Sequence, residues 1–298
     1  METTELLKKV RKIEIKTRGL SRHIFSGEYH SAFKGRGMAF SEVREYQPGD
    51  EIRAIDWNVT ARFNHPYIKI FEEERELIIM LLVDMSGSET FGTQKQLKSE
   101  LITELCAVLA FSAIQNNDKT GVIFFTDKIE KFIPPKKGKT HILRIIRELI
   151  DFNSEHTGTD ISFALRYLTN AIKKRSIAFI ISDFIDEKLF NENKNESDAL
   201  RIANKKHDIV ALRVYDKREY ELPKVGLLKI RDSETGTLKW IDTFNSKVRN
   251  HYFDFAKKRE VKLKDLFNRC GIDSVNINTS ESYIKPLMNL FKQRGSKK

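Results

Sequence analysis

Three short polar segments of the sequence contain residue types that bind hard metal ions. The first is DMSGS, in which Asp84, Ser86 and Ser88 alternate with other residues. The second is TGTD at residues 157–160, and the third is Asp183, which directly follows the run SIAFIIS. Carboxylate and hydroxyl oxygens suit Mg²⁺ or Mn²⁺, whereas zinc prefers histidine and cysteine. Together these segments predict a hard, oxygen-only metal site.

The spacing within DMSGS allows its side chains to converge on a single point. A turn that leaves a strand aims alternate side chains to one side, and Gly87 permits the tight backbone. Because magnesium keeps several waters, a site with few charged ligands can accept one more carboxylate from outside. The same residues have structural alternatives: Ser86 or Ser88 could cap a helix, Asp183 could accept hydrogen bonds from loop amides, and the last two residues of TGTD could cap the next helix.

The pattern of apolar residues predicts a sheet that brings these segments together. Leu77–Val83 is apolar without alternation, which indicates a strand buried on both faces. Strands then alternate with helices, so we expect an α/β fold with a mostly parallel sheet and helices on both faces. Ligands of such sheets bind beyond the carboxyl ends of the strands, where all three polar segments fall. The expected strands are 77–83, 120–129, 176–182, 209–215 and 274–279, with an antiparallel edge at 131–134 and a hairpin at 227–242; the expected helices are 94–116, 140–152 with Thr140 as N-cap, 160–174, 198–206, 244–270 and 281–294.

The chain divides by pattern into two parts, 1–76 and 77–298. The first part begins with a short helix at 4–14 and continues as a small β-rich region with a reversal at Pro48-Gly49-Asp50. Charges of both signs lie near Trp57 in this region and form either a docking surface or a structural network of ion pairs. These charged residues are Arg44, Asp50, Arg53, Asp56 and Arg62.

Composition and charge exclude some classes of protein. No apolar run approaches the roughly 20 residues that span a bilayer, and the N-terminus has no apolar core of signal-peptide type, so we expect a cytoplasmic protein. Cys106 and Cys270 have no partner at metal-ligand spacing and are expected to be reduced thiols. The net charge is +11, and residues 217–298 carry 19 Lys+Arg against 10 Asp+Glu. This surplus of positive charge could bind nucleic acid, anionic lipid or an acidic protein. Aromatic residues are not interleaved as base stacking requires, which favours a solvated surface instead.

DMSGS, the GTD triplet and the strand-ending Asp183 together resemble the metal-ion-dependent adhesion site, or MIDAS, of von Willebrand factor A domains. The resemblance implies a von Willebrand factor A-like, Rossmann-like domain in which Mg²⁺ binds an acidic side chain of a protein partner. Carried over by position, the implied metal residues are Asp84, Ser86, Ser88, Thr159 and Asp183, with Thr157 as an alternative to Thr159. Glycine more often follows the last aspartate in that family, so Phe184 predicts a stiffer loop.

The segment ahead of this domain resembles the signature of the bacterial domain-of-unknown-function 58 proteins. REYQPGDEIRAIDW at 44–57, TAR at 60–62 and the Glu-rich run before the first buried strand carry the resemblance, which extends over about residues 20–216. Proteins of this family are commonly associated with MoxR-type AAA+ ATPases. The resemblance implies a non-enzymatic adaptor or accessory factor in protein assembly or maturation.

Two other functions compete with this interpretation. A haloacid-dehalogenase-like phosphatase also places an aspartate beside Mg²⁺ at the end of an apolar strand, and Asp183 with Asp186 could form its acidic loop. That chemistry needs a general acid two residues after the nucleophile, where this chain has Ser86. The motifs GxxxxGK[ST], HExxH and GxSxG are absent. A nucleic-acid-binding module that uses the basic C-terminal third is the other alternative.

Overall fold

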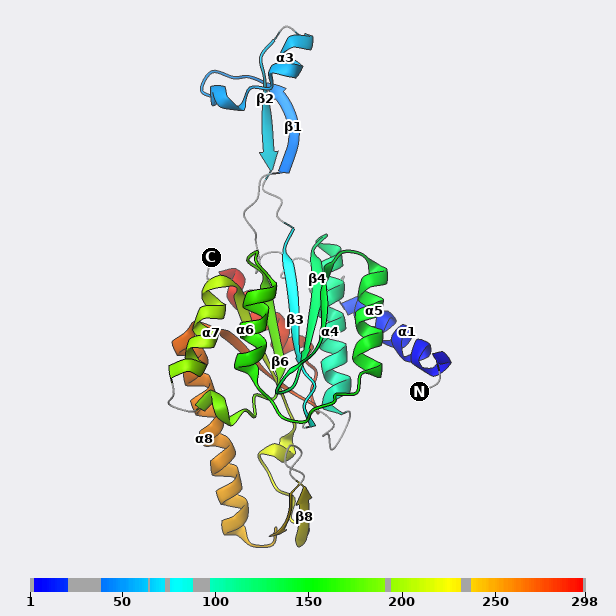
Figure 1. Ribbon diagram of the computed structural model, residues 1–298, viewed down its shortest axis with the longest axis vertical. Helices are drawn as coiled ribbons and strands as arrows, with labels where there is room; N and C mark the ends of the chain where they lie inside the picture. The colour runs from blue at the N-terminus through cyan, green and yellow to red at the C-terminus, as the bar shows by residue number, and fades with distance from the viewer. Residues whose placement is uncertain are drawn as a thin grey trace. The chain divides into compact units, whose positions relative to one another are not determined.

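The structure is a computed structural model that describes residues 3–20, 39–63, 65–72, 76–87, 97–190, 194–231 and 237–296 (Figure 1). The chain forms two compact units. The larger comprises Met1–Phe33 and Ile78–Lys298, and the smaller comprises Lys34–Leu77. None of the helices in the described ranges is long and apolar enough to cross a membrane.

A six-stranded sheet forms the centre of the larger unit. Its strand order is β10-β7-β6-β3-β4-β5, and every neighbouring pair is parallel except β4 with the edge strand β5. The first strand of this sheet, β3, therefore lies in its middle. The chain adds β4 and β5 toward one edge and then returns to add β6, β7 and β10 toward the other. This is the doubly wound order, and its topological switch point lies at the carboxyl ends of the neighbouring strands β3 and β6. The strands are β3 (Ile78–Asp84), β4 (Lys119–Phe125), β5 (Ile129–Lys136), β6 (Ile177–Ser182), β7 (Asp208–Tyr215) and β10 (Asp273–Asn278).

Helices pack on both faces of this sheet, which confirms the predicted α/β class. The apolar cluster that contains Met80 and Leu82 of β3 is covered by α6 (Ile161–Ala171), α7 (Lys194–Lys206) and α8 (Ser246–Cys270). A second cluster joins α4 (Lys98–Gln115) and α5 (Lys139–Asp151), and α9 (Ile284–Ser296) closes the chain beside β10. The absence of alternation in β3 has the predicted cause, because its residues from Ile79 to Asp84 are all buried.

The first helix belongs to the larger unit, which corrects the predicted division at residue 76. Helix α1 (Thr3–Leu20) is longer than expected and places Val10 in the cluster between α4 and α5. Two ion pairs fix it there, Lys16 with Glu104 at 2.6 Å and Glu14 with Lys139 at 2.6 Å. These partners lie about a hundred residues away in sequence, so no local pattern of the first residues could reveal them.

The smaller unit is the predicted β-rich region. Strands β1 (Ala39–Glu45) and β2 (Tyr67–Glu72) pair antiparallel, and a 3₁₀ turn (Ile52–Ala54) and α3 (Trp57–Phe63) lie between them. The guanidinium of Arg44 holds the Asp50 carboxylate through two hydrogen bonds of 2.8 Å, and this contact lowers the pKa of Asp50. Asp56 accepts a hydrogen bond from the amide of Asn58 at 3.0 Å and so caps α3. Within this unit, three of the predicted charged residues, Arg44, Asp50 and Asp56, thus have structural roles.

Two predicted helix starts had different outcomes. Asp160 is the N-cap of α6, because its side chain accepts a hydrogen bond from the Phe163 amide at 2.8 Å. Thr140 is not the N-cap of α5: the helix begins one residue earlier, after Gly138, whose φ of 100° turns the chain without a side-chain cap. The predicted hairpin forms as β8 (Leu227–Arg231) and β9 (Leu238–Asp242), and its expected turn at 234–236 lies outside the described residues.

We expect the protein to lose stability at mildly acidic pH because of the imidazole of His207. The side chain is buried, and burial, followed by the charges of Lys206 and Arg175, lowers its pKa from 6.5 to about 4. Between these values the unfolded chain binds a proton that the folded chain does not, so the free energy of unfolding falls as the pH falls. We expect this residue to account for a loss of roughly 2–3 kcal/mol between about pH 7.5 and about pH 4.5.

Urea unfolding at the two pH values measures that loss. In His207→Gln the drop should be smaller than in the wild type by the same amount. The matched control His251→Gln changes an exposed ring and should keep the full drop. A drop in His207→Gln equal to that of the wild type would show that another group causes the acid sensitivity.

Candidate functional site

The polar segments predicted from the sequence meet at the carboxyl edge of the sheet. Asp84 ends β3 and Asp183 follows β6, and these two strands are parallel neighbours paired at Val83 and Ile181. The DMSGS and TGTD segments contact each other directly, because the Gly87 amide donates a hydrogen bond to the carbonyl of Thr157 at 3.1 Å. The site therefore lies at the topological switch point, where doubly wound folds bind their ligands.

The carboxylate of Asp84 is completely buried. Its Oδ1 accepts a hydrogen bond from the Ser86 amide at 3.0 Å, and its Oδ2 accepts one from the Ser182 hydroxyl at 2.6 Å. Burial and then the nearby carboxylate of Asp183 raise its pKa to about 7. Within the described part of the chain no cation contacts this group. A buried carboxylate without a cation is costly, so this position favours either a bound proton or a bound cation.

The second carboxylate, Asp183, is paired with a buried lysine. The side chain of Lys98, at the start of α4, is 1% exposed, and its ammonium lies 2.8 Å from Asp183 Oδ2 and 2.5 Å from Glu219 Oε1. Asp183 Oδ1 accepts a hydrogen bond from the Ile185 amide at 3.0 Å. Burial raises the pKa of Glu219, and the ammonium of Lys98 opposes that shift. Asp183 and Glu219 thus share one ammonium, which does not contact the neighbouring Asp84.

The loop after Asp183 has an uncommon backbone conformation. Phe184 has a φ of 57°, in the left-handed region that costs a bulky residue about 1–3 kcal/mol. Packing compensates for this strain, because the buried ring contacts Phe267 of α8 edge-on with 5.1 Å between ring centroids. The guanidinium of Arg213 on β7 also donates a hydrogen bond to the carbonyl of Asp183 at 3.3 Å. The loop is therefore held from two sides, by the Phe184 ring and by the carbonyl of Asp183.

Of the remaining predicted metal residues, the structure describes Ser86 and Thr159 but not Ser88. Ser86 is buried and does not cap α4, whose N-cap is Leu97. Ser88 lies outside the described residues. Thr159 is 7% exposed whereas Thr157 is exposed, so Thr159 is the threonine that the fold encloses at this edge.

Sequence reasoning missed three residues of the site, namely Lys98, Ser182 and Glu219. Ser182 carries a weak signal, since it directly precedes Asp183 at the same strand end. Lys98 resembles an ordinary first-turn helix residue, and its partner Asp183 is 85 positions away. Glu219 forms a short capping box with Asp216. This local role accounts for the residue type, so the sequence gives no sign of its contact with the distant Lys98.

A second cluster of possible ligands supports the TGTD segment from outside. His156 Nδ1 lies 3.0 Å from Glu130 Oε1, and Glu155 is close enough that the three side chains could hold an ion. However, His156 Nε2 is 3.1 Å from the ammonium of Lys128, and Glu130 also bonds the hydroxyl of Thr126 and the His156 amide. The cluster therefore ties the turn after β4 to the segment before Thr157.

Fold and site together define a doubly wound α/β protein with a buried pair of carboxylates at its switch point. The chain belongs to the family described as "Protein of unknown function DUF58", which matches residues 42–262. This confirms the resemblance that the REYQPGDEIRAIDW segment indicated.

Several proteins are similar to the chain in sequence or structure. The uncharacterized protein Rv1480 of Mycobacterium tuberculosis is 26% identical over 296 residues, 99% of this chain and 91% of that protein. The uncharacterized protein YeaD of Bacillus subtilis is 29% identical over 109 residues, 37% of this chain and 25% of that protein. Among solved structures, BatB from Bacteroides thetaiotaomicron has a TM-score of 0.45 at 17% identity and covers 74% of this chain and 99% of its own. A von Willebrand factor type A protein from Catenulispora acidiphila has a TM-score of 0.42 at 10% identity, with 76% and 44% covered.

Removal of the buried ammonium should destabilise the protein strongly. Lys98→Met leaves the buried carboxylates of Asp183 and Glu219 without this cation, and breaking a buried pair from one side costs about 3–5 kcal/mol. Urea unfolding in EDTA measures the loss. The control Lys139→Met breaks the more exposed pair with Glu14 and should cost less than about 1 kcal/mol. Equal losses in the two variants would refute the role of Lys98.

Proposed function

We propose that this protein is a non-enzymatic, metal-dependent protein-interaction factor. Mg²⁺ or Mn²⁺ at the carboxyl edge of the sheet is held by oxygens of the predicted residues, and a protein partner supplies an acidic side chain to the ion. The metal residues are Asp84, Ser86, Ser88, Thr159 and Asp183.

A single observation supports this proposal most strongly: Asp84 is fully buried, lies beside a second carboxylate, and contacts no cation in the described ranges. Lys98 balances the charge of Asp183 or of Glu219 but not of both. A negative surplus therefore remains among these buried side chains. A divalent cation would offset it and lower the pKa of Asp84.

The donor chemistry at this edge fits such an ion. Asp84 accepts hydrogen bonds from the Ser86 amide, the Ser86 side chain and the Ser182 hydroxyl, and because a carboxylate has about four lone pairs, it can still bind an ion. The neighbouring side chains of Ser86 and Thr159 are buried hydroxyls. A bound Mg²⁺ keeps open positions and a net positive charge, which suits capture of an incoming carboxylate. The protein's own groups orient the site through Ser182 and Lys98.

Binding suits this arrangement better than catalysis. A phosphatase of the rival class needs a proton donor two residues after its nucleophile, and Ser86 has no acidic proton at neutral pH. The family resemblance implies a MoxR-type AAA+ ATPase as a partner and protein assembly or maturation as the process. An adaptor that uses a metal to capture an acidic segment is consistent with both.

Substitution of Asp84 should abolish metal binding. We expect wild-type protein to bind Mg²⁺ in calorimetry and to gain thermal stability with millimolar MgCl₂, because a ligand that binds only the folded state stabilises it. Asp84→Asn should show neither effect. Asp151→Asn changes an exposed carboxylate at the end of α5 and should behave as wild type.

Two results would contradict this proposal. One is Mg²⁺ binding by Asp84→Asn at wild-type affinity. The other is Mg²⁺-dependent hydrolysis of an aryl phosphate that disappears in Asp84→Asn, which would favour the phosphatase. Loss of fold is monitored separately by circular dichroism, so that an unfolded variant is not counted as a metal-site variant.

A further inference from the structure

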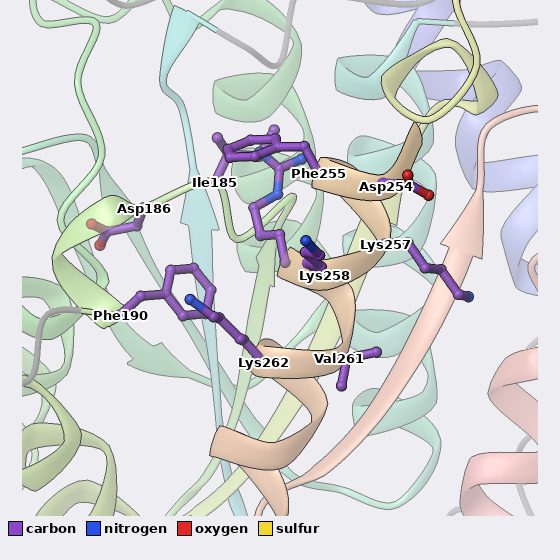
Figure 2. Close-up of a pocket in the computed structure, with 10 residues that line it drawn as sticks. Ile185, Asp186, Phe190, Asp254, Phe255, Lys257, Lys258, Val261 and Lys262 are labelled. Atoms are coloured by element: carbon purple, nitrogen blue, oxygen red, sulfur yellow. The ribbon is translucent and has the colours of Figure 1, made fainter. Parts of the chain in front are cut away.

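A cavity of about 620 Å³ lies between α8 and the segment that follows β6 (Figure 2). It is separate from the candidate metal residues, although both occur at the same end of the sheet. Figure 2 shows Asp186 and Phe190 on one side of this pocket and the α8 residues Lys258 and Lys262 on the other. The first half of α8 extends past the sheet in Figure 1.

The walls of the pocket are apolar. Ile185 and Phe190 contribute from the segment after β6, and Phe255 and Val261 contribute from α8. Phe255 is 60% exposed and Val261 is 51% exposed, which is unusual for large apolar side chains on so charged a helix. They lie off the stripe by which α8 packs on the sheet, whose buried members are Ala256, Leu263, Leu266 and Phe267. Core packing therefore does not explain their side-chain type.

Positive charge surrounds these walls. Lys258, Arg259 and Lys262 line the pocket, and no ion pair within the described residues engages any of them. Lys257 pairs with Glu260 at 2.9 Å and is already balanced.

The carboxylates at the pocket do not cancel this charge. Asp186 is one of them, and its oxygens accept hydrogen bonds from the Ile161 amide at 3.1 Å and the Lys188 amide at 2.9 Å. Asp254 is the other carboxylate that lines the pocket. Lys258, Arg259 and Lys262 outnumber these two carboxylates, so a net positive charge remains around an apolar hollow.

We propose that this pocket binds an acidic segment of a partner protein. The segment inserts a large apolar side chain between Phe190 and Phe255 and places carboxylates against Lys258, Arg259 and Lys262. A buried apolar anchor surrounded by complementary charges is the usual composition of a strong protein contact. An amphipathic helix in a groove provides both features at a spacing of three to four residues. The proposal does not require a bound metal.

The concave shape favours a protein segment over a lipid surface. A bilayer binds apolar side chains that project together beyond the surrounding charges. Here Phe190 and Ile185 are half-buried, on the wall opposite the charged helix. A side chain can enter between these walls, whereas a flat bilayer reaches only the rim.

Selection from a displayed library of random peptides, each of roughly 12 residues, tests this proposal. Selection on the full chain in EDTA should enrich peptides that combine acidic residues with Leu, Phe or Trp. The enriched peptide, labelled for fluorescence anisotropy, should bind at least about tenfold more weakly to Lys258→Glu/Lys262→Glu than to the wild type. Phe255→Ser should weaken binding as well, without the change of charge.

The matched control is Lys247→Glu/Lys264→Glu. Both residues are exposed on α8 and outside this pocket, and the change of net charge is the same. This control should keep most of the affinity. Equal losses in the two double variants, or enrichment without acidic residues, would overturn the proposal. So would binding to phosphatidylcholine–phosphatidylglycerol vesicles that Lys258→Glu/Lys262→Glu abolishes, because the pocket would then recognise lipid.

The peptide-binding result can be distinguished from the result of the metal-binding experiment. Peptide binding to the pocket should be unchanged in Asp84→Asn and should not depend on Mg²⁺. Failure of metal binding with intact peptide binding would refute only the proposed metal role, and the reverse pattern would refute only the pocket.

Discussion

The burial of two carboxylates at neighbouring strand ends is the constraint on which the rest of this edge depends. Asp84 and Asp183 are almost fully buried, so their charge must be offset by fixed groups, by a proton or by an ion. The protein brings Lys98 from α4 and the hydroxyl of Ser182 to meet part of that demand. Such groups are effective only if they are held rigidly, which explains why a fully buried strand lies directly behind them.

The doubly wound topology provides that rigidity. Strands β3 and β6 start opposite halves of the sheet, so their carboxyl ends lie side by side while their connections leave in different directions. Lys98 can then reach Asp183 from α4 while Arg213 supports the carbonyl of the same residue from β7. The left-handed Phe184 shows that the loop conformation is imposed by its surroundings, since the isolated residue would avoid it.

The sequence predicts features that depend on local residue pattern, but not features that depend on tertiary contacts. The stripe at Ile142, Ile145, Ile146 and Leu149 is the set that α5 buries, because helix periodicity directly encodes the inner face. The lack of alternation in β3 likewise revealed burial on both faces. The pairing of Lys98 with Asp183 has no such local trace.

The same difference between local pattern and tertiary contact explains the two predictions that were wrong. Helix α1 was assigned to the wrong unit because its ion pairs join it to residues far along the chain. The start of α5 was misplaced because Gly138 replaces the expected hydroxyl cap with a positive φ. Both depend on backbone conformation or distant partners, which residue types alone do not specify.

The segment from Asp183 to Phe190 connects the candidate metal site to the pocket beside α8. Its Asp186 accepts a hydrogen bond from the first amide of α6, and its Lys188 pairs with Asp160 at 2.9 Å, directly after Thr159. One short segment thus carries Asp183, is bonded to the turn that carries Thr159, and forms a wall of the pocket. Because these contacts fix its backbone, the two surfaces keep a constant spacing. A partner that is acidic at both points would bind them jointly, and the second contact would form at high effective concentration.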